Sequence, residues 1–80
     1  MMTETKVAER TVYVPALAGG EDAATLEREL RKMEGVVEVA VDAARHEVRI
    51  VWTEATVDWA AVRWFMEQMG YPPGGEHGGG

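Results

Sequence analysis

The sequence predicts an α+β domain in which two helices cover one face of a mostly antiparallel sheet. Two segments carry apolar residues at helical spacing, three alternate at strand spacing, and glycine or proline marks several of the boundaries. The 80 residues allow one domain, and a chain of this size buries roughly 60% of its unfolded surface. We therefore expect a single thin core between the sheet and the helices.

A first strand is expected over 7–14. Val12 and Val14 fall on one side of an extended chain and Tyr13 falls on the other. Pro15 ends the strand, because proline has no N–H to donate to a ladder. Val12 and Val14 are therefore predicted to be core residues.

A first helix is expected to follow and to stop at Gly35. Its apolar stripe, at i, i+3, i+7 and i+10, consists of Ala23, Leu26, Leu30 and Met33. Glu21 and Asp22 lie at its start and Arg31 and Lys32 at its end, which is the charge order that complements the helix dipole.

Two further strands are expected around a loop at 42–46, forming a β-hairpin. The inward residues of these strands are predicted to be Val37, Val39 and Val41, then Val48, Ile50 and Trp52.

A second helix is expected after Asp58, the best N-cap candidate, and ends at Gly70. Its inward stripe consists of Val62, Phe65, Met66 and Met69. Trp64 lies on the opposite side of this helix and is expected to face water, whereas Trp59 is expected to close the edge of the core.

The order of elements matches the ferredoxin-like plan, a βαββα(β) sandwich with both helices on one face. The fourth strand is predicted to be missing or very short, because two prolines follow Tyr71 and five of the last seven residues are glycine. The domain is expected at 7–73, between a flexible N-terminus at 1–6 and a disordered Gly-rich tail at 74–80. The outer edge of the first strand would then be open to another chain.

The composition excludes several functions. A formal charge of −6 disfavours nucleic acid and anionic membrane surfaces as partners. The sequence has no cysteine and no serine, which excludes these nucleophiles, and its two histidines form no convergent acid–base pair with other groups. No stretch approaches the roughly 18 continuous apolar residues of a membrane span. We expect a non-catalytic, cytoplasmic protein without membrane insertion.

Five short segments at characteristic spacing carry a family resemblance. They are Val12-Tyr13-Val14, Met33-Glu34-Gly35-Val36, Val39-Ala40-Val41-Asp42, Glu47-Val48-Arg49-Ile50 and Met69-Gly70-Tyr71-Pro72. Over about residues 10–72 the chain resembles the heavy-metal-associated domain. That family includes small copper chaperones, mercury-binding proteins and N-terminal modules of metal-pumping ATPases.

The resemblance fails at the residues that carry the family's chemistry. The family binds soft ions through a Gly-Met-x-Cys-x-x-Cys loop, in which two thiolates at a helix N-terminus grip an ion such as Cu(I). Alignment back from Gly35 places this loop at 16–22, with Leu17 at the methionine position and Gly19 and Asp22 at the cysteine positions. The CxxC motif is absent, so the resemblance implies the scaffold without its thiol site.

Hard ligands are the alternative at this loop. Glu21 and Asp22 offer two carboxylates, and His77 in the tail offers an imidazole, but two carboxylates make a poor cage for Ca²⁺ or Mg²⁺. Capping of helix amides is the favoured reading for both acids. His46 stands where the family often has glycine, which implies a left-handed, solvated turn residue. We therefore expect no cofactor.

The sequence thus predicts a non-catalytic, heavy-metal-associated-like domain that acts through protein contact or self-association. The candidate interaction residues are Trp64 on the second helix, and Val12 and Tyr13 at the first-strand edge, where a protein partner or a homodimer would pair. The alternative is binding or trafficking of copper, mercury or zinc through a rebuilt site without cysteine, at Asp22, Glu21 and His77.

Overall fold

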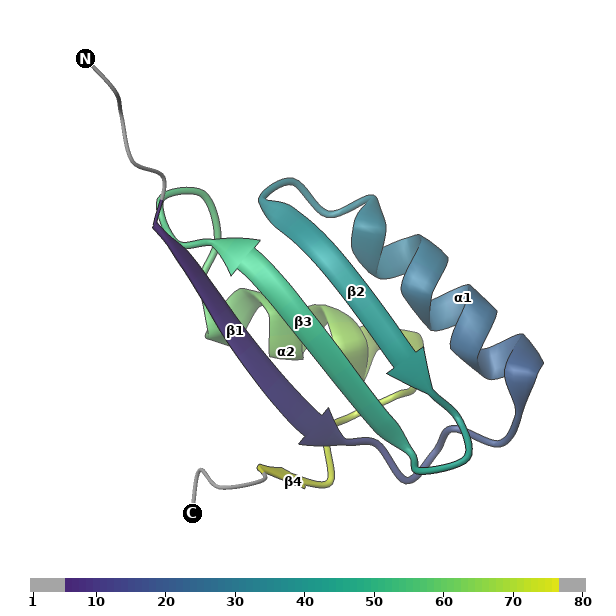
Figure 1. Ribbon diagram of the computed structural model, residues 1–80. Coiled ribbons are helices and arrows are strands. Elements are labelled where there is room, and N and C mark those ends of the chain that lie inside the picture. Colours follow the sequence, from purple (N-terminus) through teal and green to yellow (C-terminus); the bar gives the residue numbers. More distant parts are fainter. Residues whose placement is uncertain (1–5, 77–80) are drawn as a thin grey trace.

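The computed structural model describes residues 6–76 and has two layers, a sheet with both helices on one of its faces (Figure 1). In chain order the elements are β1 (Val7–Tyr13), α1 (Gly20–Arg31), β2 (Val36–Asp42), β3 (Glu47–Thr53), α2 (Trp59–Met69) and β4 (Gly75–Glu76). The strand order is β2-β3-β1-β4, and every neighbouring pair is antiparallel. This architecture confirms the predicted ferredoxin-like α+β sandwich.

The fourth strand is very short, as predicted. Its two residues pair with Val12 and Tyr13 of β1. The chain reaches this position by passing close to Pro15: a Cβ atom added at Gly74 would lie 2.7 Å from the Pro15 Cδ atom. Gly74 also donates its N–H to the Tyr13 carbonyl at 2.6 Å.

Residues 75 and 76 of the predicted tail at 74–80 pair with β1 in the sheet. Residues 77–80 lie outside the described part. Of the predicted N-terminal segment 1–6, only Lys6 is described, and its carbonyl accepts a hydrogen bond from the Glu54 N–H at 3.1 Å.

The core lies between the sheet and the two helices, as the apolar patterns predict. Its fully buried side chains include Val12, Val14, Leu17, Leu26, Leu30, Val48, Ile50, Val62 and Met66. Trp52 is also buried, and Trp59 stacks on it with ring centroids 5.7 Å apart. The expected inward position of Trp52 and the place of Trp59 at the edge of the core are both confirmed.

One predicted core residue, Val37, is exposed. Val36 pairs with Trp52, whereas Glu38 pairs with Val51, so Val37 is an extra residue in β2. Such a bulge shifts the alternation by one residue, and the side chain of Val37 turns outward with 59% of its surface exposed. The prediction for Val37 was wrong because strict alternation was assumed through the start of the strand.

Helix α1 ends earlier than predicted. Arg31 is its last residue, and Met33 packs against the core from the following turn. Gly35 has a φ of 98°, and a Cβ atom there would lie 2.8 Å from a methyl carbon of Val57. Gly35 is therefore required by the loop into β2 and is not the residue that stops the helix.

The start and end of α2 agree with the sequence. Gly70 ends the helix in the left-handed conformation, and the Asp58 carboxylate accepts the Ala61 N–H at 3.0 Å. We expect Asp58→Ala to lower the free energy of unfolding by about 1 kcal/mol, because one of the unpaired helix amides loses its acceptor. Urea denaturation measures this loss, and Asp58→Asn, which keeps an acceptor oxygen, should restore most of it.

Candidate functional site

The loop that joins β1 to α1 is anchored in the core. Leu17 is fully buried, and its N–H donates to the Val14 carbonyl at 3.2 Å. Gly19 precedes the helix in an extended conformation, with a φ of 175°, and supplies no side-chain cap. A Cβ atom at Gly19 or at Gly20 would have no neighbour within 4 Å. The buried Leu17 side chain therefore holds the loop in place, and there is open space beside Gly19 and Gly20.

Asp22 joins three segments of the chain. Its Oδ2 atom accepts the Ala18 N–H at 2.9 Å, and its Oδ1 atom accepts the Tyr71 hydroxyl at 2.8 Å. Asp22 is the third residue of α1, so its carboxylate reaches back to the loop before the helix, in the manner of the acidic partner of a capping box. The predicted capping of the helix's own amides was wrong for Asp22, since it bonds to the amide of Ala18 instead.

These hydrogen bonds shift the ionisation of both side chains. The Tyr71 hydroxyl, and after it the Ala18 N–H, stabilise the carboxylate and lower the pKa of Asp22. The same carboxylate raises the pKa of Tyr71, because removal of the phenol proton would cost the hydrogen bond. Asp22 is therefore held as an anion that serves as an internal acceptor.

We expect Tyr71→Phe to flatten the acid side of the stability profile. A carboxyl with a lowered folded pKa contributes stability that is complete above its unfolded pKa and disappears as the pH falls through the folded value. Removing the hydroxyl returns the pKa of Asp22 toward its usual value, so the variant should lose less stability between neutral and acidic pH. Urea midpoints across this range measure the effect. Asp22→Asn removes the titrating carboxyl itself and should flatten the slope in the same direction.

The described chain does not gather the candidate metal ligands of the alternative function. Within residues 6–76 there is no group of three or more His, Cys, Asp or Glu side chains placed to hold a metal ion. Glu21 is exposed, Asp22 has both oxygens in internal hydrogen bonds, and His77 lies outside the described residues. His46 has the predicted left-handed conformation, with a φ of 58°. Its ring is half-buried and lies 5.8 Å from the ring of Tyr13, so the expectation of a solvated side chain was wrong.

The three predicted interaction residues do not form one surface. Trp64 projects from α2 with 60% of its surface exposed, as predicted. Tyr13 is 39% exposed, whereas the Val12 side chain is fully buried, so only the backbone of Val12 reaches the sheet edge. That edge is paired with β4 at both residues. The predicted open edge is therefore covered at Val12 and Tyr13.

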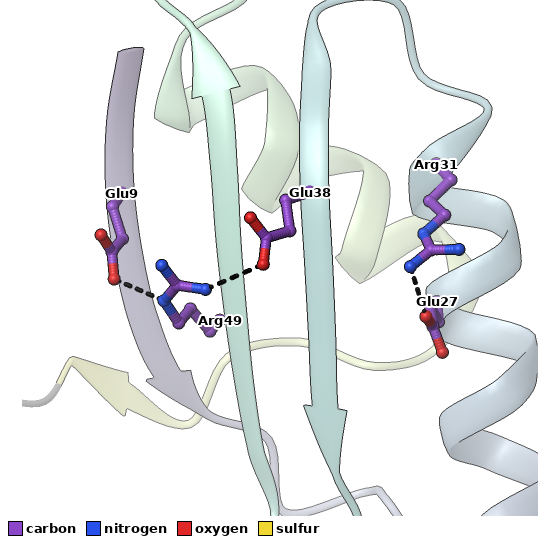
Figure 2. A network of polar contacts seen from close by, with 5 residues as sticks. All are labelled: Glu9, Glu27, Arg31, Glu38 and Arg49. Carbon is purple, nitrogen blue, oxygen red and sulfur yellow. Dashed lines mark hydrogen bonds and ion pairs between the residues drawn. The ribbon is translucent and has the colours of Figure 1, made fainter.

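A charged cluster on the helix-free face of the sheet was missed by sequence reasoning. Arg49 on β3 bonds to the carboxylates of Glu9 on β1 and Glu38 on β2, the latter at 3.2 Å (Figure 2). The bond to Arg49 lowers the pKa of Glu9. Alternation along the three strands carried the signal, because it places these residues on one face, but finding the cluster required the register between strands. A separate pair, Glu27 and Arg31, lies along α1 at 2.7 Å.

Comparison with known structures identifies the fold. Oxidized MerP from Ralstonia metallidurans CH34 is 21% identical, with a TM-score of 0.78, over 84% of this chain and 93% of that chain. The CsoZ metallochaperone is 16% identical, with a TM-score of 0.76, over 85% of this chain and 97% of that one.

The water-soluble region of the P-type ATPase CopA from Bacillus subtilis is 25% identical, with a TM-score of 0.82, over 89% of this chain. The match covers 47% of that region, so this chain spans about half its length. No family model and no curated protein matches the sequence.

The fold and the loop together define the class of this domain. It has the ferredoxin-like fold of the heavy-metal-associated domains, as the sequence resemblance indicated, and its loop lacks the CxxC motif. Among residues 6–76, no helix is long and apolar enough to cross a membrane.

Proposed function

We propose that this chain is a non-catalytic, heavy-metal-associated-like domain that has lost its thiol metal site and acts in the cytoplasm through contact with other proteins. The proposal rests on the position and the hydrogen bonds of the Asp22 carboxylate. Asp22 occupies the position of a family cysteine, and both of its oxygens accept hydrogen bonds from within the chain, from Ala18 and Tyr71. A metal ion at Asp22 would have to share this carboxylate with the two donors.

The lack of sulfur ligands for soft ions supports the proposed loss of the metal site. Cu(I) and Hg²⁺ are held in proteins by thiolates and thioethers, and the sequence has no cysteine. At the position of the family's methionine, Leu17 is fully buried and has no sulfur. The scaffold therefore keeps its packing at the loop while losing every soft donor there.

Protein contact is favoured by the exposed indole on α2. Trp64 has 60% of its surface in water, although a tryptophan side chain gains from burial. Tryptophan is enriched at the centres of protein interfaces and depleted on other surfaces. Trp64 and the β1 edge are the two surfaces that we assign to partners.

Metal titration under native mass spectrometry tests the loss of the site. We expect no stoichiometric complex with Cu(I), Zn²⁺ or Hg²⁺ at micromolar concentration. A complex tighter than micromolar that disappears in Asp22→Asn would overturn the proposal. Sedimentation and Trp fluorescence test the protein contact: a strict monomer at high concentration, with a fully solvent-like Trp64, would count against self-association. Trp64→Ala should weaken any association that is observed, whereas Gln68→Ala on the same helix should not.

Metal trafficking is the second candidate function. Its support is that solved structures of this fold include a metallochaperone, and that Asp22 keeps a hard ligand at the family's cysteine position. Under this alternative Asp22, Glu21 and His77 would hold copper, mercury or zinc. The titration above distinguishes the two candidates directly.

A further inference from the structure

The outer edge of β1 is covered along only part of its length. The strand has seven residues, and within residues 6–76 β4 pairs with Val12 and Tyr13 alone. Figure 1 places β4 beside the C-terminal end of β1, with no other described element along the remainder of that edge. The stretch 7–11 is therefore an edge within the described chain.

The backbone groups that face this edge follow from alternation. The Lys6 carbonyl accepts from Glu54 and the Val14 N–H donates to His46, so both of these residues face β3. The Tyr13 carbonyl accepts from Gly74 and faces the opposite side. Successive residues of an antiparallel strand direct their hydrogen-bonding groups to alternate sides. Val7, Glu9 and Thr11 consequently direct theirs to the outer edge.

The two faces of the sheet differ in chemistry next to this edge. On the helix side, Ala8 packs against the core, and Trp59 is partly buried beneath the Arg10 guanidinium, whose carbon lies 4.8 Å from the ring centroid. On the helix-free side, the Glu9 side chain is 52% exposed and shares the single guanidinium of Arg49 with Glu38. The helix side thus offers Ala8 and the Trp59 ring beneath the Arg10 cation, and the helix-free side has one carboxylate more than Arg49 can neutralise.

Resting on the proposed function, we propose that the 7–11 edge of β1 accepts an extended segment of another protein as an added antiparallel strand. In the added strand, the side chains that face Ala8 and Trp59 are apolar, and the alternate side chains, which face Glu9, are basic. Strand addition draws affinity from the backbone groups of Val7, Glu9 and Thr11 and specificity from the alternating side chains. β4 occupies the last two positions of the same edge and limits the added strand to the remaining five.

A second copy of this chain fits the edge poorly. A two-fold antiparallel pairing confined to 7–11 is centred on Glu9 and places the two Glu9 carboxylates directly opposite each other. Like charges directly opposite are destabilising in a sheet, and Arg49 is already shared between two acids. A lysine or arginine of a different protein at the same place adds the missing cation.

The test uses the full chain and three capped eight-residue peptides: alternating Val and Lys, alternating Val and Glu, and the Val/Lys peptide N-methylated along one edge. We expect the Val/Lys peptide at millimolar concentration to shift the amide resonances of Val7, Glu9 and Thr11 in a ¹⁵N-HSQC titration. The Val/Glu peptide should bind about fivefold more weakly, since its carboxylates face Glu9. The N-methylated peptide should lose binding, because it cannot form the ladder.

Two protein variants locate the contact. Thr11→Pro removes one outward N–H without touching the ladder to β3 and should weaken Val/Lys binding about tenfold, whereas Thr11→Val keeps the N–H and the affinity. Glu9→Lys leaves the backbone intact and should reverse the preference, so that the Val/Glu peptide binds better. In each variant, dispersed amide resonances from residues of β1 and β3 establish that the variant is folded.

Three results would overturn the strand-addition proposal. They are the absence of peptide binding, binding that maps to Trp64 or α1 instead of β1, and a peptide preference that Glu9→Lys leaves unchanged. Binding that maps to Trp64 would leave the proposed protein-contact function standing, whereas tight metal binding in the separate titration would remove that function whatever the peptides do.

Discussion

Replacing both Gly19 and Asp22 with cysteine is expected to create a soft-metal site in this domain. An added side chain at Gly19 has open space, with no atom within 4 Å of its Cβ, and the extended φ of 175° suits any residue. Gly19 is the N-cap residue and Asp22 is the third residue of α1, the two positions that a capping box brings together, and the N-terminus of α1 lowers the pKa of both thiols. We expect the Kd for Cu(I) to fall by about a thousandfold, equal to about 4 kcal/mol of binding free energy.

The matched control places the same two cysteines at Gly20 and Asp22. A Cβ at Gly20 also has open space, but residues at i and i+2 do not face each other on a helix. This variant should bind Cu(I) far more weakly in a competition titration against a colorimetric chelator. Equal affinity of the two variants, or no gain in either, would mean that the scaffold has lost more than its thiols.

Leu17→Ala is expected to be the most destabilising single change in the loop. The side chain is fully buried in the core, and truncation of a buried leucine costs about 2–5 kcal/mol through lost burial and the cavity that remains. Domains of this kind have total stabilities of about 5–15 kcal/mol, so the variant should lose a large share of its stability. The midpoint of urea denaturation, followed by tryptophan fluorescence, measures the loss.

Two further substitutions serve as controls for Leu17→Ala. Leu17→Met conserves volume and should cost less than about 1.5 kcal/mol, and it restores the residue type that the family has at this position. Val37→Ala truncates an apolar side chain that is 59% exposed and should change the stability by no more than about 0.5 kcal/mol. A Leu17→Ala midpoint equal to that of Val37→Ala would contradict the assignment of Leu17 as the anchor of the loop.

The elements that the sequence predicted well are those with strong local signals. The alternation around Val12 and Val14, the N-cap at Asp58 and the left-handed stop at Gly70 each depend on a few neighbouring residues, and each is present in the structure. The outward position of Trp64 followed from helical periodicity for the same reason.

The errors occurred where residues distant in sequence decide the geometry. The bulge at Val37 depends on its register with β3, which a single strand does not reveal. The helix-free-face cluster of Arg49 with Glu9 and Glu38 likewise needs three strands in register. The ring of His46, in the turn between β2 and β3, is half-buried and lies near Tyr13 of β1, a residue distant in sequence.

The sequence by itself determined the class of fold and the absence of thiolate chemistry, because periodicity, capping residues and the lack of cysteine are properties of the chain alone. Only the tertiary structure decided what replaces the lost site. The partner of Asp22 is Tyr71, 49 residues away, and a hydrogen bond across that separation exists only once α1 and the segment after α2 have packed together. The tertiary structure also decided how much of the β1 edge is covered, because the two residues of β4 pair with Val12 and Tyr13, which are distant from them in sequence.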